Sequence, residues 1–591
     1  MKMFPFCLKN PQDIDAAIAE FQKQCPKKYS SILCIVFSST TKSDTVLALC
    51  RQITSVLPEV RVAGNTSSGE IFDGHLALET IIVNFMVFET SLVTARIFDT
   101  GKSSASDAAA LLREQLLDEP LLKGVGFVTT PSILNEINIF SDVLSELPSG
   151  IKIFGCSADS YMSMKTNRDE EAAVFTDKEW TTKGFLLLLF SGEDLNIQVG
   201  SYIGWKPLGR EVTITGLKNR STVSSFDNKP AISLYEKYLG IVPEKDFYRP
   251  LITFPIIVRR DGHKITRVAY AYEQDGSIRF SGDCRIGERA HLAYGDPLSM
   301  RKHLHQLFAE VHSFAPQGIL IYSCIVRRLY LKKEVNNELS PFAKIAPTAG
   351  AYSFGEIRRY DGYTNVHLMN SALMTIAFRE GEKPASMPID IPPMENTMSE
   401  HLSLISGLAN FVRVTNKELE QANKELRYLA NTDRLTNLLN RGATETSLKE
   451  ILEGCRRNPE KETGVLMLDL DYFKKVNDTF GHEEGDRVLR KASRIMQASV
   501  RHSDPVGRWG GEEFMIILPD CSLETTVKIA ETIRRNIRTI ILPDKNRMTA
   551  SIGATAASSS DTIDSLYTRL DTLLYEAKKN GRNRVCADES E

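Results

Sequence analysis

Two short acidic segments in the last third of the chain carry residue types that could hold a metal ion and a nucleotide. Asp469 lies near the end of the apolar run 465–470, and Glu512 with Glu513 follows a pair of glycines. Neighbours in a strand point to opposite faces, so one of the two glutamates must point inward and meet a cation. If the two strands are adjacent, Asp469 and Glu512 converge. Carboxylates together with phosphate oxygens are ligands that Mg²⁺ prefers, so the segments predict a metal–nucleotide site.

The glycine pair Gly510-Gly511 stands between two strand-like runs. Paired glycines predict a hairpin with a type I′ turn, which needs positive φ at both central residues. Because glycine has no Cβ, the same two residues would let the backbone approach phosphate groups closely. Taken alone, the adjacent glutamates are explained equally well as surface charge, and it is their coincidence with Asp469 that favours a site.

Two cations follow near the C-terminal end of the chain. Lys578 and Arg582 are four residues apart on what the pattern predicts to be the end of a helix. Residues at this spacing share a helix face, so the pair could present two positive charges to a polyphosphate, arginine through two parallel hydrogen bonds.

The elements that must position these residues fall into distinct regions. Residues from about 10 to 380 alternate strand-like and helical patterns, and four prolines then fall within ten positions, 384–393, which a helix does not cross. A helical stretch and a second α/β region follow. We therefore expect an α/β and α+β multidomain protein. Its predicted parts are two halves of an N-terminal α/β region, 10–215 and 216–382, a linker, 383–398, a signalling helix, 399–431, and a C-terminal domain, 432–588.

The helical stretch has a heptad pattern in which seven of eight seam positions are apolar. The seam residues are Ile405, Leu408, Val412, Thr415, Leu419, Ala422, Leu426 and Leu429. One interpretation is an amphipathic helix that lies on its own domain. We favour a parallel dimeric coiled coil, because both flanking domains look complete without it, and Thr415 weakens the seam near its middle.

The N-terminal region contains an internal repeat. Residues 63–71 and 349–357 share the pattern AGxxSxGEI, each copy follows a comparable strand, and 154–159 is a partial third echo. The repeat is either a pair of structural turns or a pair of loops that line a ligand cleft. The sensor-loop candidates are Gly64, Ser67, Gly69, Glu70, Gly350, Ser353, Gly355 and Glu356.

These glycine-rich loops and the strands before them resemble the FIST family, over about 25–380. The resemblance implies a sensory module with an N-terminal and a C-terminal half, thought to bind small ligands such as amino acids, and some members have been linked to haem and nitric oxide. The seven histidines of the region show no diagnostic haem motif, so haem in the sensor domain is an option that the residues themselves do not support.

The C-terminal region resembles the GGDEF domain of diguanylate cyclases over about 430–588. The match rests on the segments already quoted together with 432–441, 480–486 and 549–553. Glu512 stands where the family name has Asp, an accepted variant, and Asn437 replaces a common Gly. The resemblance implies a central five-stranded, mainly antiparallel sheet wrapped by helices.

The resemblance also implies a role for each matched residue. The catalytic set is Asp469, Glu512 and Glu513. Two Mg²⁺ or Mn²⁺ ions per active site would be held by Asp469, the carbonyl of Leu470 and Glu512. GTP would be bound by Phe473, Asn477, Asp486, Gly510, Gly511, Lys578 and Arg582, with Asn477 and Asp486 on the guanine edge. Arg501 and Asp504, an RxxD with five residues between it and Gly510, would form the product-inhibition site.

The implied reaction condenses two GTP molecules into cyclic di-GMP with release of pyrophosphate, which makes the chain a nucleotidyltransferase. Because one domain binds one GTP, two chains must meet, and the expected partner is a second copy. The expected ligands are GTP, cyclic di-GMP as product and inhibitor, and an unknown small molecule at the sensor. Two alternatives stay open: a silent GGDEF domain that only binds GTP or cyclic di-GMP, and a haem or nitric oxide sensor that regulates the cyclase.

The composition of the chain excludes several classes of protein. A chain of 591 residues needs several cores, and its 72 Lys and Arg against 75 Asp and Glu leave a formal charge of −3, so no global field favours nucleic acid or an anionic membrane. The ten cysteines form no CxxC pair, which is typical of a reducing compartment. The N-terminus lacks a signal-peptide pattern, and the longest apolar run, 185–190, is too short to span a bilayer. We therefore expect a cytoplasmic protein.

Overall fold

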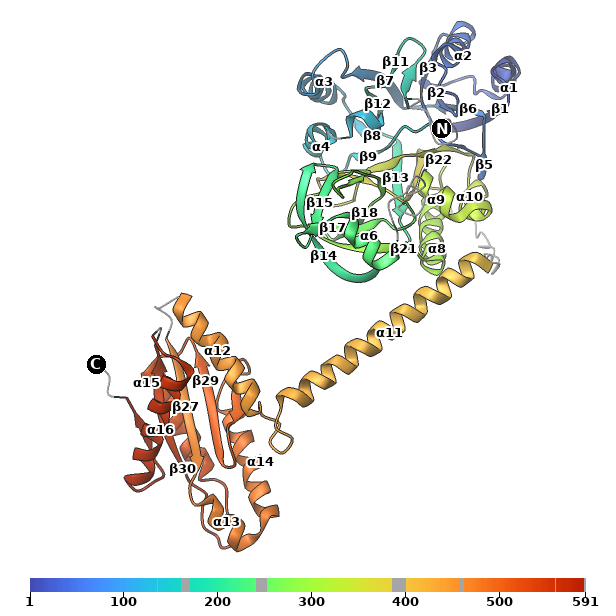
Figure 1. Cartoon of the computed structure of the whole chain (residues 1–591). Coiled ribbons are helices and arrows are strands. Elements are labelled where there is room, and N and C mark those ends of the chain that lie inside the picture. Colours follow the sequence, from blue (N-terminus) through green and yellow to red (C-terminus); the bar gives the residue numbers. More distant parts are fainter. Residues whose placement is uncertain are drawn as a thin grey trace. The chain divides into compact units, whose positions relative to one another are not determined.

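The computed structural model describes residues 1–588 apart from 135, 161–170, 241–251, 385–399, 458–461 and 559 (Figure 1). The described chain forms two compact units, Met1–Leu408 and Ala409–Glu591. Most of the proline-rich linker predicted over 383–398 lies outside the described residues.

The N-terminal unit contains one folding plan three times. The first copy consists of β1 (Lys2–Leu8), α1 (Ile14–Gln24), β2 (Ser31–Ser38), α2 (Ser43–Val56), β3 (Val60–Thr66), the hairpin β4 (Glu70–Phe72) and β5 (His75–Ala77), and β6 (Ile81–Phe88). The second consists of β7 (Leu92–Asp99), α3 (Ala105–Leu117), β8 (Leu122–Thr129), α4 (Ile137–Ser145), β9 (Lys152–Ser157), the hairpin β10 (Val174–Thr176) and β11 (Trp180–Thr181), and β12 (Gly184–Ser191).

The third copy is split by an insertion. It consists of β13 (Leu195–Tyr202), α8 (Pro297–Phe314), β22 (Gly318–Cys324), α9 (Ile325–Leu331), α10 (Val335–Ala343), β23 (Thr348–Ser353), the hairpin β24 (Gly355–Arg359) and β25 (Val366–Met369), and β26 (Leu373–Glu380). The insertion, residues 205–295, is an eight-stranded sheet with one described helix. It comprises β14 (Trp205–Asn219), β15 (Thr222–Phe226), β16 (Lys229–Pro230), α6 (Ile232–Leu239), β17 (Ile256–Arg260), β18 (His263–Arg267), β19 (Ala269–Tyr272), β20 (Ile278–Phe280) and β21 (Arg289–Gly295).

The three copies exchange hairpins in a ring. Their sheets have the same strand order, β1-β6-β2-β3-β10-β11, β7-β12-β8-β9-β24-β25 and β13-β26-β22-β23-β4-β5. In each sheet the third and fourth strands are parallel and every other pair is antiparallel. The first copy completes the third sheet, the third completes the second, and the second completes the first. The copies are therefore interlocked, and the two-copy repeat seen in the sequence is part of a threefold arrangement.

Close strand packing explains the repeated glycine. A Cβ on Gly64, Gly155 or Gly350 would lie 2.1, 1.8 or 1.9 Å from the carbonyl oxygen of the residue opposite it in the adjacent parallel strand, a separation that no side chain tolerates. Gly155 belongs to the partial echo 154–159, so this echo marks the second of the three copies.

The repeated Ser and Glu form an internal hydrogen bond in both copies that have them. Ser67 Oγ donates to Glu70 Oε1 at 2.6 Å, and Ser353 Oγ donates to Glu356 Oε1 at 2.8 Å. Both glutamates are completely buried, each paired with the residue after the repeated glycine of the neighbouring copy. Val174 of the second copy occupies the same position in the first sheet, which is why the second copy lacks the pattern.

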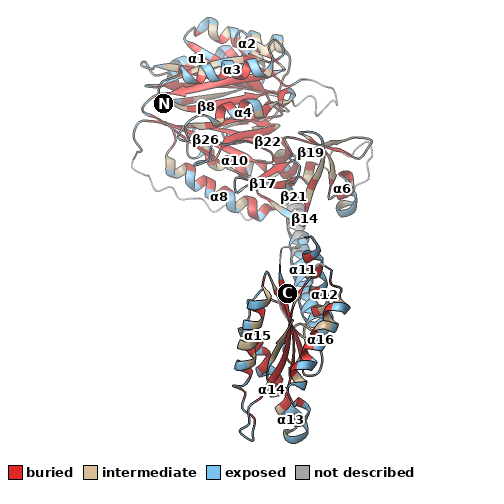
Figure 2. Cartoon of the chain, turned by 90° about the vertical axis from the view of Figure 1, so that its left-hand side faces the viewer, coloured by how far each residue is buried: buried red, intermediate tan, exposed pale blue. Residues whose placement is uncertain are grey.

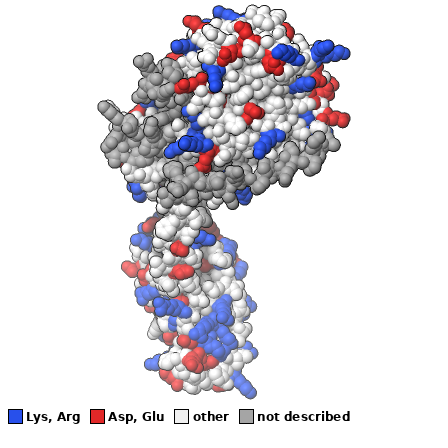
Figure 3. Space-filling view, turned by 90° about the vertical axis from the view of Figure 1, so that its right-hand side faces the viewer, with Lys and Arg blue, Asp and Glu red and all other residues white. Residues whose placement is uncertain are grey.

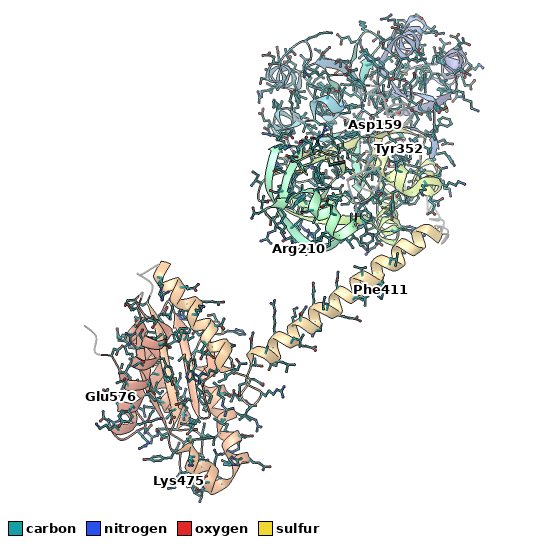
Figure 4. All side chains as sticks on the ribbon, viewed as in Figure 1. Asp159, Arg210, Tyr352, Phe411, Lys475 and Glu576 are labelled. Carbon is teal, nitrogen blue, oxygen red and sulfur yellow. The ribbon has the colours of Figure 1, made fainter. Side chains whose placement is uncertain are left out.

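The loops that contain these residues bond to one another. Ser68 N donates to Tyr352 O and Tyr352 N to Gly69 O, while Asp159 N donates to Thr66 O. The hydroxyl of Ser68 also donates to Asp159 Oδ2 at 2.6 Å. Figure 4 shows Asp159 and Tyr352 near each other in the middle of the unit. This mutual bonding favours the structural-turn interpretation of the repeat.

We predict that buried Glu70 makes the N-terminal unit lose stability as the pH rises. Burial raises the pKa of Glu70 from 4.5 to about 8, against the opposing effects of Ser67, Thr80 and Arg328. Between these values the folded chain holds the proton and the unfolded chain does not, so the free energy of unfolding falls with rising pH. Calorimetry at pH about 6 and about 8.5 should show a lower Tm at the higher pH, and Glu70→Gln should reduce this difference. An unchanged difference, matching that of the exposed control Glu193→Gln, would contradict the prediction.

The C-terminal unit contains a five-stranded sheet of order β28-β29-β27-β30-β31, as the resemblance implied. The strands are β27 (Thr463–Leu470), β28 (Val506–Arg508), β29 (Glu513–Pro519), β30 (Ala550–Ala557) and β31 (Val585–Ala587). Only β30 and β31 are parallel. The helices are α11 (Glu400–Asn431), α12 (Arg441–Arg457), α13 (Phe473–Phe480), α14 (His482–Ala498), α15 (Leu523–Ile537) and α16 (Ile563–Lys579).

Alternation along the central strand creates two cores. Leu466 and Leu468 of β27 pack with α14 and α15, whereas Val465 and Met467 pack with α12 and α16. Figure 2 shows the strands as the buried part of the sheet and the helices with an exposed outer face. Both cores lie on the faces of the sheet, so polar side chains can lie at the edge where β27 ends.

The helix expected over 399–431 is present as α11, which spans 32 residues. Within the described ranges, we find no helix with the length and apolarity required to cross a membrane. Figure 3 shows Lys and Arg interspersed with Asp and Glu over the visible surface, in keeping with the near-zero formal charge.

Candidate active site

Pairing of β27 with β29 brings the two acidic segments together. Asp469 lies opposite Glu513 in the register, and Leu470 N donates to Glu512 O at 3.3 Å. Asp469 is only 8% exposed. Burial raises its pKa to about 6, the hydrogen bond and charge of Lys578 oppose this rise, and the charges of Glu512 and Glu513 add to it. The sheet edge therefore concentrates negative charge at one buried point.

Lys578 neutralises that charge directly. Its Nζ lies 2.8 Å from Asp469 Oδ2, so the ammonium occupies the position that a metal ion would need on this carboxylate. In the described part of the chain, no three His, Cys, Asp or Glu side chains are arranged to hold a metal ion. The donor types are those that a hard cation prefers, and a cationic group already lies on one of them, so the chemistry of the residues fits Mg²⁺ or Mn²⁺.

The glycine loop differs from the predicted type I′ turn. Neither Gly510 nor Gly511 has a positive φ, so that prediction was wrong. Strand β28 ends at Arg508 and β29 begins at Glu513, which leaves four residues between the strands, too many for a two-residue turn. Arg508 closes this loop instead, because its Nη2 and Nε donate to Gly511 O at 2.7 and 3.1 Å.

The two glycines have different surroundings. A Cβ on Gly510 would lie 2.8 Å from Glu513 Oε2, whereas a Cβ on Gly511 would meet no atom within 4 Å. Gly511 therefore leaves open space beside the carboxylates, as close approach of a phosphate requires.

The contact between α13 and α14 presents a second polar pair, Asn477 and Asp486. A Cβ on Gly485 would lie 1.9 Å from Asn477 Oδ1, so Gly485, the residue before Asp486, is what allows Asn477 to lie against α14. Phe473, at the start of α13, is 5% exposed. Among the described residues the amide of Asn477 has no side-chain partner, and Asp486 has only a 3.8 Å contact with Arg490. The pair is available to a ligand.

Arg582 is not on the helix that carries Lys578. Helix α16 ends at Lys579, and Arg582 follows in a left-handed conformation with φ of 60°. Gly581, with φ of 108°, breaks the helix before the expected face is complete. The Arg582 guanidinium stacks 4.4 Å from the Tyr472 ring centroid and donates to Tyr472 Oη at 3.2 Å.

Asp471 is a positioning residue to which the sequence analysis gave no role. Its carboxylate accepts hydrogen bonds from Thr549 Oγ1 and Ser551 Oγ, both at 2.7 Å, and from Asn583 N at 3.0 Å. It thereby ties the end of β27 to β30 and to the loop that carries Arg582. Its place two residues after Asp469, hence on the same side of the chain, was the available signal.

Arg501 and Asp504 form a closed turn at the surface. Asp504 N donates to Arg501 O at 3.0 Å, and Arg501 N donates to Asp504 Oδ2 at 2.9 Å. The exposed Arg501 guanidinium has no partner among the described residues.

Three family models match the chain in order. Residues 32–229 match the FIST N domain, residues 231–359 the FIST C domain, and residues 430–584 the model described as diguanylate cyclase, GGDEF domain. The chain therefore carries an N-terminal FIST region followed by a C-terminal GGDEF domain. Both resemblances seen in the sequence are thereby confirmed, and the candidate site lies wholly within the GGDEF domain.

Individual relatives match this GGDEF domain. Diguanylate cyclase DgcM of Escherichia coli strain K12 is 37% identical over 174 residues, which are 29% of this chain and 41% of DgcM. The uncharacterized protein YhcK of Bacillus subtilis strain 168 is 36% identical over 171 residues, 28% of this chain and 48% of YhcK. This chain thus spans less than half the length of either relative.

A solved structure is also similar. The coiled coil and GGDEF domain of DgcB from Caulobacter crescentus, in complex with c-di-GMP, is 30% identical with a TM-score of 0.30, and the match covers 32% of this chain and all of that one.

Proposed function

We propose that this chain is a diguanylate cyclase that condenses two GTP molecules into cyclic di-GMP and releases pyrophosphate. The observation that carries the proposal is the placement of Asp469 beside Glu512 and Glu513, with Lys578 in contact, inside a domain that matches the cyclase family model.

Asp469, the carbonyl of Leu470 and Glu512 would hold two Mg²⁺ or Mn²⁺ ions per active site, and Glu513 would assist them. When bound, the ions lower the pKa of the attacking 3′-hydroxyl and offset charge on the α-phosphate. Haem is not part of the proposal. His263 stacks on Tyr360 at 3.7 Å and His367 bonds Asp261 at 3.0 Å, so both have other roles.

Lys578 would exchange partners during the binding of substrate. In the absence of substrate its ammonium pairs with Asp469. A metal–triphosphate complex offers Asp469 a stronger cation and offers Lys578 an anion, so both charges stay compensated after the exchange. Arg582, held by Tyr472, would bind the same triphosphate, and Asn477 with Asp486 would bind the guanine edge.

Two copies of the chain must meet for the product to form, and α11 is the proposed means. In one chain its seam side chains Leu408, Leu419, Leu426 and Leu429 are 54–62% exposed, an apolar stripe that a second α11 would cover. Thr415 does not leave its hydroxyl unpaired in this seam, because Oγ1 donates to Phe411 O at 2.9 Å.

The FIST unit would sense a small ligand and change the pairing of α11, and with it the meeting of the two cyclase domains. A cytoplasmic location fits this proposal, since GTP is a cytoplasmic substrate and all ten cysteines are free.

Product inhibition depends on Arg501 in this proposal. Arg501→Ala should leave the initial rate of the cyclase unchanged and weaken inhibition by added cyclic di-GMP by at least about tenfold, because a charge-assisted contact to phosphate is lost. Initial rates measured against a series of product concentrations would show this. Inhibition as strong as in the parent chain would exclude the assignment.

The test of the function is incubation of purified, dimeric chain with GTP and Mg²⁺, followed by chromatography of the nucleotides. We expect cyclic di-GMP. A silent domain would bind GTP or cyclic di-GMP but leave GTP unchanged. This result would refute the proposed enzyme activity.

A further inference from the structure

A cavity of about 430 Å³ lies where the insertion meets the second copy of the threefold fold, entirely within the N-terminal unit. The insertion is the part that departs from the shared plan. It supplies one wall of the cavity, and α4 with the exchanged hairpin β24–β25 supplies the other. Junctions of this kind between packed parts are where small-molecule sites form most often.

The cavity lining is mostly polar, and four apolar side chains form a small patch of it, which we call the floor. Phe127, Ile137, Ile357 and Leu368 line it and belong to the hydrophobic core under α3 and α4. A carbon skeleton can therefore rest on this floor without burying a polar group.

The wall formed by the insertion is rich in arginine. Arg260, 8% exposed, bonds Asp283 and Glu288 with 2.7 Å contacts to each. Arg267, 1% exposed, bonds the same Asp283 from behind at 2.7 Å, and Arg285 approaches it at 3.7 Å. Three guanidiniums thus share one carboxylate, and two acidic groups cannot balance them.

Two further arginines line the cavity without a partner. Among the described residues, the side chains of Arg220 and Arg259 form no hydrogen bond or ion pair, and both are exposed. With Arg260 and Arg285 they place four guanidiniums on the wall formed by the insertion, against three carboxylates of the same wall, Asp261, Asp283 and Glu288.

The remaining carboxylates do not pair with Arg220 or Arg259. Asp261, in the turn between β17 and β18 of the insertion, is already engaged by Asn365 at 2.8 Å and by His367 at 3.0 Å. Burial lowers the pKa of His367, so the ring is neutral near pH 7. Asp142 of α4 is the carboxylate that the opposite wall contributes, beside the neutral Asn138 and Ser141. Four guanidiniums and four carboxylates therefore line the cavity, and Arg220 and Arg259 are the two of these arginines whose side chains have no partner among the described residues.

We propose that this cavity binds a small organic anion, whose carboxylate or phosphate group is held by Arg220 and Arg259 and whose carbon skeleton lies on the apolar floor. Arginine forks match either anion with paired hydrogen bonds, and the volume is that of a small-metabolite pocket. Such a ligand would tie the insertion to α4. Its use as the sensory signal rests on the proposed cyclase function, whereas binding itself does not.

Calorimetric titration of the full chain with succinate, and separately with inorganic phosphate, tests the proposal and distinguishes the two anion chemistries. We expect one saturable site per chain for at least one probe. The double variant Arg220→Gln/Arg259→Gln should weaken its binding at least about tenfold. Arg289→Gln, an exposed arginine of the same insertion outside the cavity, should leave binding unchanged.

Lys578→Gln should also leave the binding unchanged, because it alters the phosphate-binding candidate of the other unit. Absence of saturable binding for both probes would overturn the proposal. So would undiminished binding by the arginine double variant, or loss of binding in Lys578→Gln. The titration needs no cyclase activity, so failure of the cavity and failure of the enzyme are separate results.

Discussion

Replacing Glu512 and Glu513 with glutamine is expected to lower the rate of cyclic di-GMP synthesis by at least about a hundredfold. The two side chains follow the Gly511 opening and act on Asp469 across the paired strands β27 and β29. Glutamine keeps their size and removes both charges. The variant should therefore fold as the parent does and lose the negative potential that holds the cations. Product formed from GTP and Mg²⁺ per unit time is the quantity to measure.

A matched control is available in the same domain. Glu524, on α15, is exposed and pairs with Lys528 at 2.6 Å, away from the sheet edge. Glu524→Gln should retain the parent rate. If the Glu512/Glu513 variant kept most of its activity, or if Glu524→Gln lost as much, the acidic edge of the sheet would not be the catalytic centre.

Placing lysine at Leu419 and Leu426 is expected to separate the chain into monomers and to abolish cyclase activity. Both leucines are at least 60% exposed in a single chain and lie two turns apart in the seam. In a dimeric coiled coil the two lysines of one chain would face those of the other. The apolar contacts of the seam would be lost and the like charges would repel, which should weaken the dimer at least about a hundredfold. Sedimentation analysis would give the oligomeric state, and the same sample would give the rate.

Glu420→Lys is the matched control for this pair. It produces the same change in net charge on the outer face of the same helix, where Glu420 is exposed. It should leave the chain dimeric and active. A Leu419/Leu426 variant that stayed dimeric would refute the coiled-coil seam, and a monomeric variant with full activity would refute the need for two chains.

The sequence predicted those parts of the site that depend on residue types within a single strand or loop. Asp469 and Glu512 were expected to converge if their two strands were adjacent. The strands β27 and β29 are adjacent, and their register places Asp469 opposite Glu513, the residue after Glu512. The turn at Gly510-Gly511 was predicted wrongly, because loop length depends on where the strands stop pairing, which two residues do not encode. Arg582 leaves its helix for a similar reason, since Gly581 acts only through its backbone conformation.

Non-local features could not be read from the sequence. The second copy of the N-terminal plan has Val174 where the first and third have glutamate, so similarity of residues does not reveal it. The exchange of hairpins joins strands from different copies and has no local signature. The contact between Lys578 and Asp469 joins residues 109 positions apart in the sequence. In the absence of substrate the Asp469 carboxylate is therefore paired with an ammonium group.

The stoichiometry of the reaction tests the central claim most directly. Purified dimeric chain should be given GTP and Mg²⁺, and the cyclic dinucleotide and pyrophosphate should be measured in the same samples over time. The proposed condensation predicts two pyrophosphates released for every cyclic di-GMP formed, at every time point. GTP that remains intact, or pyrophosphate released without cyclic di-GMP, would contradict it.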